Sequence, residues 1–211
     1  MSARGHVSAV IRVRGGVCMG RLATGTGALL VALAATFGSG DGVAWAAEGT
    51  QGAAFTVYHD GKFAWPGDYS FVATPDYRDT SGAPATGKYD IKVTLTGAWG
   101  GWQPFATNWV FDTTPYNYLQ FAFKPTQPGQ SAQVYFMLVG DKPVGSGVDP
   151  FKYGPPPVPG QWGVYTIPLA DIGVARTKIY KFAIQDKTGI KTNVFYVNDV
   201  RFLAEAPVPP P

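Results

Sequence analysis

Apolar and polar side chains alternate in short runs between residues 55 and 202. The clearest run covers residues 89–96, where Ile91, Val93 and Leu95 share one face and polar residues occupy the other. A period of two is typical of a β-strand that buries one face. No window free of glycine and proline repeats apolar residues at helical spacing, so the pattern predicts strands rather than helices.

Turn-forming residues such as Asp60-Gly61 and Asp186-Lys187-Thr188-Gly189 separate these runs. The expected strands cover residues 55–58, 69–72, 89–96, 109–111, 118–123, 133–139, 162–169, 179–185 and 194–202. About nine strands with no helix between them predict an all-β fold, an antiparallel β-sandwich or jelly roll.

One of these strands is apolar on both faces. Within residues 133–139 the even positions are apolar, and so are Tyr135 and Met137 on the other face. An apolar outer face is either covered or used for binding. The next residues, 140–161, carry six prolines and no strand pattern, so we expect a long and stiff loop there.

The beginning of the chain resembles an export signal. Residues 1–46 combine four arginines, an apolar stretch too short for a comfortable membrane span, and the small-x-small sequence Ala44-Trp45-Ala46. We therefore expect a signal peptide over residues 1–46, a β-sandwich domain over 47–205 and a proline-rich tail over 206–211. Such a protein is secreted or periplasmic and keeps no membrane span after the signal is removed.

Removal of the leader changes the charge. The whole chain has 17 basic and 14 acidic residues, of which the leader holds four arginines and Asp41. Thirteen residues of each sign remain, so the mature part is neutral and has no basic field to attract nucleic acid. Cys18, the only cysteine, also lies in the leader, which excludes disulfides and thiolate metal sites.

Few residues after position 46 carry catalytic chemistry. His59 is the only histidine there, which excludes Ser-His-Asp systems and multi-histidine metal sites. A glycosidase needs two carboxyl groups about 5–10 Å apart, one of them with a raised pKa. Glu48 and Glu205 lie near the ends, and most aspartates lie in turns, where they have a structural explanation. We therefore expect that the protein is not an enzyme.

Trp99 and Trp102 lie in the glycine-rich stretch Gly97-Ala98-Trp99-Gly100-Gly101-Trp102, directly after the clearest strand. Glycines permit positive φ and leave neighbouring rings uncovered. An exposed planar ring can stack on the apolar face of a sugar. The sequence thus favours a binding platform here, and the alternative is that both rings turn inward and close the core.

A sugar site also needs polar groups beside its rings. Tyr69 and Tyr135 could stack or form hydrogen bonds from a sheet face. Gln185 and Asp186 end a strand and could bind sugar hydroxyl groups, with a solvated turn as the alternative explanation. These four residues and the two tryptophans form the predicted ligand-binding set.

Three segments resemble secreted β-sandwich carbohydrate-binding modules of the jelly-roll superfamily. Residues 161–173 resemble their "W-x-x-V-x-I-P-L-x-D-x-G" segment, and residues 195–202 resemble their closing strand. The turn at 111–114 and the strand after it also fit their pattern. The resemblance covers most of the chain from about Ile91 onward and implies binding of a polysaccharide or oligosaccharide, on a concave sheet face or on loops at the sandwich edge.

The same resemblance implies a structural calcium ion near the chain ends. Asp199 matches the aspartate of the closing strand, and Asn198 stands where a second acid is usual. Asp60 is the candidate ligand from the first strand. The alternative is that Asp199 caps a turn or pairs with a lysine.

Two functions remain open. The first is a secreted, non-catalytic carbohydrate-binding protein that recognises a polysaccharide through exposed aromatic residues. The second is a structural or adhesive envelope protein that uses the apolar outer face of residues 133–139 to bind a protein or itself. The sequence leaves the sugar and the oligomeric state undetermined.

Overall fold

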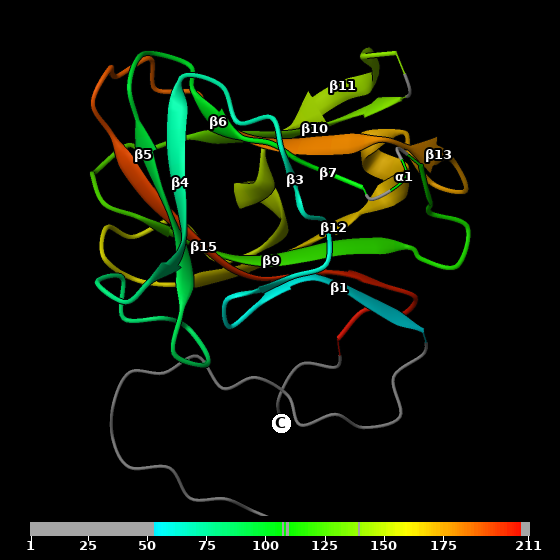
Figure 1. Cartoon of the computed structure of the whole chain (residues 1–211), viewed down its shortest axis with the longest axis horizontal. Helices are drawn as coiled ribbons and strands as arrows, with labels where there is room; N and C mark the ends of the chain where they lie inside the picture. Colours follow the sequence, from blue (N-terminus) through cyan, green and yellow to red (C-terminus); the bar gives the residue numbers. More distant parts are fainter. Residues whose placement is uncertain (1–52, 107, 109, 139, 208–211) are drawn as a thin grey trace, which may run out of the picture. The chain divides into compact units, whose positions relative to one another are not determined.

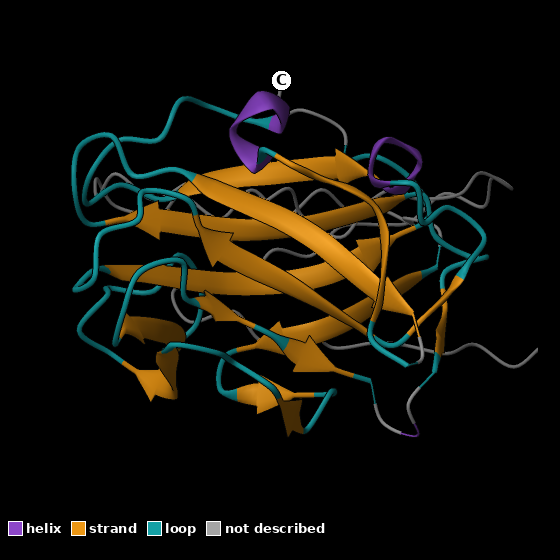
Figure 2. Cartoon of the chain, turned by 90° about the horizontal axis from the view of Figure 1, so that it is seen from above, coloured by secondary structure: helices purple, strands orange, loops and turns teal. Residues whose placement is uncertain are grey.

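The computed structural model describes residues 53–106, 108, 110–138 and 140–207. In these residues the chain is nearly all β and its strands pair antiparallel, which confirms the predicted fold class (Figures 1 and 2). No helix in this part is long and apolar enough to cross a membrane. The predicted signal peptide and residues 208–211 of the predicted tail lie outside the described residues.

The first sheet has seven strands in the order β12-β9-β15-β1-β2, with β5 also paired to β15 and β4 paired to β5. The strands are β1 (Ala54–His59), β2 (Lys62–Phe63), β4 (Ala73–Asp79), β5 (Asp90–Leu95), β9 (Tyr118–Pro125), β12 (Gly163–Pro168) and β15 (Val194–Leu203). β15 is central because it pairs with β1, β5 and β9.

The second sheet has six strands in the order β11-β10-β14-β7-β3, with β6 also paired to β14. They are β3 (Gly67–Asp68), β6 (Gly101–Trp102), β7 (Pro104–Phe105), β10 (Ala132–Leu138), β11 (Lys142–Val148) and β14 (Lys181–Asp186). A small pair joins β8 (Phe111–Asp112) to β13 (Lys178–Ile179). Figure 1 shows β9 and β1 in one layer and β10 and β7 in the other.

The core fills the space between the two layers and is rich in aromatic rings. Its largest fully buried side chains include Trp65, Trp102, Phe121, Phe136, Phe182 and Phe202. Successive residues of a strand face opposite sides of a sheet, so these inward positions fix which residues point outward. The outward residues therefore form the two faces on which a ligand can be bound.

The prediction of a long loop over residues 140–161 is wrong in its first part. Residues 142–148 form β11, a hairpin partner of β10, because Val144 and Val148 pack on the core. The glycines and proline of this strand hide its pattern in the sequence. After it, η2 (Pro150–Tyr153) is capped by the Asp149 side chain, which accepts a hydrogen bond from Phe151 N.

Three further segments differ from the predicted pattern. The predicted strand over residues 69–72 is absent, and Phe71 makes only an isolated bridge to Gly101. Residues 73–79, predicted to be mainly turn and loop, form β4; Pro75 is tolerated because β4 is an edge strand paired with β5 alone. A single turn of helix, α1 (Leu169–Ile172), stands where a turn is expected and ends at Gly173 with φ 83°.

Candidate functional site

The outer face of the six-stranded sheet collects aromatic and amide side chains. Along β10, Ala132, Val134 and Phe136 are buried, whereas Gln133, Tyr135 and Met137 point outward and are half-buried. Their partners on β14 follow the same alternation. The outward partners are Gln185 opposite Gln133, Ala183 opposite Tyr135 and Lys181 opposite Met137.

The other half of this face comes from β7, β6 and the residues that follow β3. Phe105 lies opposite Lys181 on one side and Gly67 on the other. Tyr69 N donates to Gln103 O (2.9 Å), and Phe71 pairs with Gly101. We call the whole surface the aromatic face, and it comprises Tyr69, Phe71, Gln103, Phe105, Gln133, Tyr135, Met137, Lys181, Ala183 and Gln185.

Two glycines leave space for aromatic rings on this face. A methyl group on Gly67 would lie 1.9 Å from an atom of the Phe105 ring, so the ring occupies the space above the glycine. Phe71 similarly lies over Gly101, at 3.1 Å from such a methyl group. Rings are thus packed closely onto the sheet where a glycine leaves space, and an aromatic ring that remains accessible can stack on a planar ligand.

Tyr69 is the most exposed ring of the aromatic face, with 44% of its surface accessible. It stacks on Phe105 with ring centroids 4.6 Å apart and an interplanar angle of 24°. Lys181 Nζ lies 4.8 Å from the Tyr69 ring centroid and 2.7 Å from Asp141 Oδ1. These contacts fix the orientation of the exposed ring.

Tyr135 and Gln185, two other predicted site residues, also lie on the aromatic face. Tyr135 is half-buried, and burial raises the pKa of its hydroxyl, so it stays neutral. Gln185 Nε2 donates to Trp99 O (2.9 Å). Tyr69, Tyr135 and Gln185 thus share one face, and Gln185 ties that face to the loop that carries Trp99.

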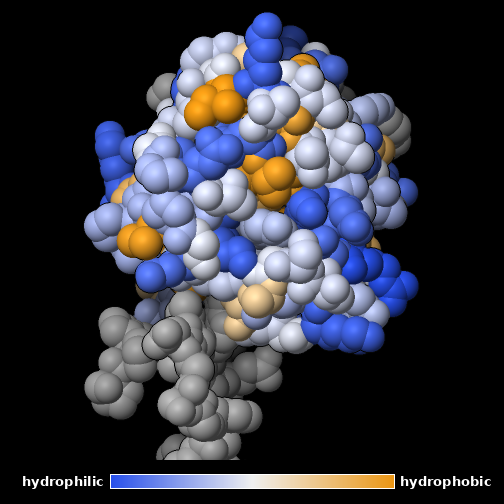
Figure 3. Space-filling model, turned by 90° about the vertical axis from the view of Figure 1, so that its left-hand side faces the viewer, coloured by the Kyte–Doolittle hydropathy of each residue, from blue (hydrophilic) through white to orange (hydrophobic). Residues whose placement is uncertain are grey.

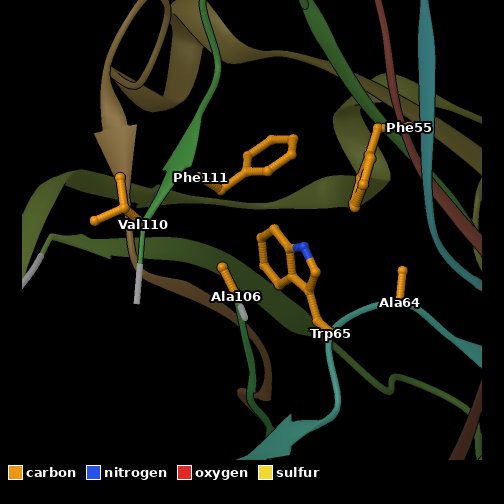
Figure 4. A pocket seen from close by; sticks show the side chains of 6 residues that line it. All are labelled: Phe55, Ala64, Trp65, Ala106, Val110 and Phe111. Carbon is orange, nitrogen blue, oxygen red and sulfur yellow. The ribbon is translucent and has the colours of Figure 1, made fainter. Parts of the chain in front are cut away.

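Trp99 is 49% exposed and adopts φ 64° in the loop between β5 and β6, as the glycine-rich pattern predicts. Lys187 Nζ lies 5.4 Å from its ring centroid. Val72 and Ile190 are also exposed in this part of the chain. Figure 3 shows the end of the molecule that holds the β5–β6 loop, where apolar groups are separated by hydrophilic side chains.

The predicted exposure of Trp102 is wrong. Its ring is fully buried, meets Phe182 edge-on at 5.7 Å, and donates from Nε1 to the Tyr77 hydroxyl (3.2 Å). The physical reason is strand alternation: Gly101 faces outward on β6, so the next residue must face the core. Trp102 therefore cannot act as a surface platform.

The prediction that Asp186 binds a ligand is wrong for the same reason. Asp186 follows the outward Gln185 on β14 and is only 1% exposed. Its Oδ2 accepts from Thr188 N (3.0 Å) and Thr188 Oγ1 (2.6 Å), and its Oδ1 accepts from Asn193 Nδ2 (3.2 Å). The carboxylate organises the turn after β14 and is not presented to a ligand.

The two residues expected to bind calcium do not fit a calcium site as they lie. The oxygens of Asp199 accept from His59 and from Thr86. Asp60 Oδ1 accepts from the backbone N–H groups of Lys88 (2.6 Å) and Tyr89 (2.9 Å), which hold the pKa of Asp60 below its usual range. The described residues contain no group of three or more acidic, His or Cys side chains placed to hold a metal, and calcium takes six to eight oxygens.

Part of the outer face of the seven-stranded sheet is covered by a connecting segment, while Thr94 stays exposed and Lys92 and Tyr196 stay half-buried. Residues 80–89, which we call the strap, cross it between β4 and β5. Trp162 Nε1 donates to Ala83 O (2.8 Å), and Asn198 Nδ2 donates to Thr86 O (3.0 Å). These two bonds tie the strap to β15 and to the start of β12.

Two charged residues are buried on that covered face. Asp90 is fully buried, and neither of its carboxylate oxygens has a hydrogen-bond partner. Burial raises the pKa of Asp90 to about 7; repulsion from Asp79 adds to the rise and Lys124 opposes it. Burial lowers the pKa of Lys124, which lies between the rings of Trp162 (5.0 Å) and Tyr196 (4.7 Å).

Several residues of the aromatic face were not predicted from the sequence. Gln133 and Lys181 had a usable signal, because they share the alternation of Tyr135 and Gln185. Phe71 also had a signal, because it lies two residues after Tyr69 in the predicted strand 69–72. Gln103 and Phe105 had none, since the strands around them are short and their pairing is not encoded by a local pattern.

No family model matches this sequence. A search of curated proteins also finds no match. Solved structures do match, at low identity, so the likeness shows the fold alone.

One match is a lysine-to-alanine variant of a family 29 carbohydrate-binding module complexed with cellulohexaose. It has a TM-score of 0.51 and 9% sequence identity, and the match covers 74% of this chain and 94% of that chain. An aspartate-to-alanine variant complexed with mannohexaose gives TM-score 0.50, 7% identity and coverages of 74% and 94%. A structure described only as a family 29 module gives TM-score 0.51, 9% identity, 74% and 90%. The chain therefore has the β-sandwich fold of the family 29 carbohydrate-binding modules.

Proposed function

We propose that this protein is a non-catalytic carbohydrate-binding protein that holds an oligosaccharide or polysaccharide chain on its aromatic face. The observation that carries the proposal is the group of aromatic rings beside outward amide side chains on one sheet. Tyr69 is exposed and fixed in place by Phe105 and Lys181. Such a ring stacks on a sugar without losing much side-chain freedom.

The polar groups beside the rings suit hydroxyl groups. Gln133 and Gln185 are half-buried, and each carries an amide that can both donate and accept hydrogen bonds; Gln103 is buried and lies beside Met137. The charge of Lys181 is compensated by Asp141. A neutral glycan of the kind bound by the structural neighbours, cellulohexaose or mannohexaose, fits this chemistry.

The carboxylates near the aromatic face have other roles, which supports a non-catalytic function. Asp141 is paired with Lys181, Asp149 caps η2, and Asp186 faces the turn after β14. Asp90, whose pKa is raised to about 7 by burial, lies under the strap on the other sheet. A glycosidase needs two carboxyl groups on either side of the same bond.

The composition of residues 1–46 supports export of the protein, so we place its function outside the cytoplasm. Polysaccharides are available as ligands outside the cytoplasm, and a protein without net charge has no electrostatic attraction to nucleic acid. Mass spectrometry of the exported protein checks the cleavage after Ala46, and an N-terminus far from residue 47 would contradict it.

Binding is tested by titrating the full protein with cellohexaose and mannohexaose in a calorimeter. Tyr69→Ala should weaken binding by about tenfold or more, because the fixed ring is lost. Tyr89→Ala is a matched control: its ring also has cations close by, Arg78 and Lys88 at 4.9 Å, but it lies at the end of the strap.

Equal affinities for wild type and both variants would contradict a site at Tyr69. No heat of binding with either sugar, combined with concentration-dependent oligomers, would instead favour the alternative of a self-associating envelope protein.

A further inference from the structure

An ion pair is built into the aromatic face. Lys181 Nζ lies 2.7 Å from Asp141 Oδ1; the lysine side chain is 7% exposed and the aspartate side chain 65% exposed. The ammonium group also lies 4.8 Å from the Tyr69 ring centroid and 5.1 Å from that of Tyr180. A desolvated cation therefore sits directly beside the most exposed ring of the face.

The carboxylate of this pair comes from a different element than the lysine. Lys181 starts β14, whereas Asp141 lies in the turn between β10 and β11 with φ 58°. A buried ammonium group is costly unless a negative group compensates it. Asp141 supplies that compensation from the hairpin, and its exposed side chain leaves a negative edge toward the solvent.

This arrangement determines how a charged sugar meets the face. If Lys181 had no carboxylate partner, its ammonium group would attract the carboxylate of a uronic acid stacked on Tyr69. With Asp141 in place the attraction is cancelled, and the exposed carboxylate repels a uronate. Lys187 and Lys142, the cations nearest to the face, are exposed, so salt and water screen their charges.

We infer that Asp141 is the specificity-determining residue of the aromatic face: by neutralising Lys181 it restricts binding to uncharged glycans and excludes chains rich in uronic acids. The inference rests on the proposed function, because it concerns the ligand class of that same face. Neither Asp141 nor Lys181 has to touch the sugar of the wild-type complex for the selection to work.

The test compares cellohexaose with a hexamer of galacturonic acid, both titrated into the full protein at low and moderate salt. Wild type should bind cellohexaose and not the uronate. Asp141→Ala should bind the uronate at least about tenfold more tightly than wild type does, and added salt should reverse the gain. The double variant Asp141→Ala/Lys181→Met should lose the gain, because the cation is gone.

Asp76→Asn is the control for net charge. It removes the same charge from an exposed residue of β4, in the other sheet, and should gain no uronate binding. Wild type binding the uronate as well as cellohexaose would overturn the inference, and so would an Asp141→Ala variant that keeps cellohexaose binding without gaining the uronate. If wild type bound neither sugar, the proposed function itself would fail, and this inference would fail with it.

Discussion

The two outer faces of the sandwich each hold a lysine between two aromatic rings, but the two lysines meet different surroundings. Lys181 lies between Tyr69 and Tyr180 on an open face and is neutralised by Asp141. Lys124 lies between Trp162 and Tyr196 beneath the strap, near the unpartnered carboxylate of Asp90. Aromatic and charged residues alone thus do not distinguish the proposed binding face from the strapped one.

What distinguishes the faces is the use of glycine. On the aromatic face Gly67 and Gly101 leave space that the rings of Phe105 and Phe71 occupy. On the covered face Gly82 lets the strap approach Asp90 so closely that a methyl group would lie 2.1 Å from Oδ2 and 2.6 Å from the Tyr196 ring. The absence of a side chain thus leaves room for aromatic rings on one sheet and for the strap on the other.

The largest expected effect comes from filling the space at Gly82. Gly82→Ala should destabilise the protein by about 1–3 kcal/mol, because the methyl group meets a buried carboxylate and a ring that have little room to move. Glycan affinity should stay unchanged, since the strap lies on the other sheet. Urea denaturation and calorimetric titration of the same sample measure both quantities.

Gly67→Ala, the matched substitution on the aromatic face, should change glycan affinity strongly and stability only slightly. Its methyl group meets the far end of the Phe105 ring, a side chain that can rotate away from the methyl group. We expect a stability loss under about 1 kcal/mol and an affinity loss of about tenfold, because the stack with Tyr69 is broken. Equal effects of the two alanine substitutions on binding would contradict the distinction between the faces.

A smaller effect concerns pH. Asp90 has a pKa of about 7 when folded, against 3.8 as its ordinary value, so the folded state binds more protons between these values. The stability contributed by protonated Asp90 is therefore fully present below about pH 4 and is lost as pH rises through about 7. The groups that face it are Asp76 and Asp79 on β4, Lys124 on β9 and Tyr58 on β1.

Asp90→Asn keeps the shape of the side chain and removes its titration. Between pH 4 and pH 8 the free energy of unfolding should fall by roughly 2 kcal/mol less in the variant than in wild type. Urea denaturation across that pH range measures the difference. When Asp90 is protonated, its proton can be shared with Asp79 in a hydrogen bond, which two ionised carboxylates cannot form. An unchanged pH profile would show that Asp90 does not titrate in this interval.

The smallest expected effect is that of calcium. The oxygens of Asp199 and Asp60 already accept protein hydrogen bonds, so the geometry around them does not favour the calcium ion that the sequence resemblance implies. We expect the melting temperature to be the same in calcium and in a chelator. A rise of several degrees with calcium would restore the metal site.

The sequence predicted the strands that alternate clearly, such as residues 91–95, because alternation directly reflects which face is buried. It was wrong for residues 69–72, which form only an isolated bridge, and it missed β4. It also predicted the exposure of Trp99, since a glycine-rich turn leaves little to cover the ring. It failed for Trp102 and Asp186 for one reason: each lies one residue away from an outward position, and a shift of one residue reverses the face.

Other parts of the site depend on contacts between distant segments. The strand β11 was not predicted because its glycines and proline mask the alternation. Phe105 reaches the aromatic face through pairing of β7 with both β14 and β3. No local pattern in the sequence contains this pairing, so only the folded chain brings Phe105 beside Tyr69.

The central claim is that the aromatic face of the six-stranded sheet binds a glycan and the strapped face does not. Nuclear magnetic resonance of the isotope-labelled protein titrated with cellohexaose tests it most directly. We predict that the amide side-chain signals of Gln133 and Gln185 shift, whereas the indole N–H signal of Trp162 stays in place. Shifts confined to Trp162 and the strap, with the two glutamines unchanged, would contradict the account.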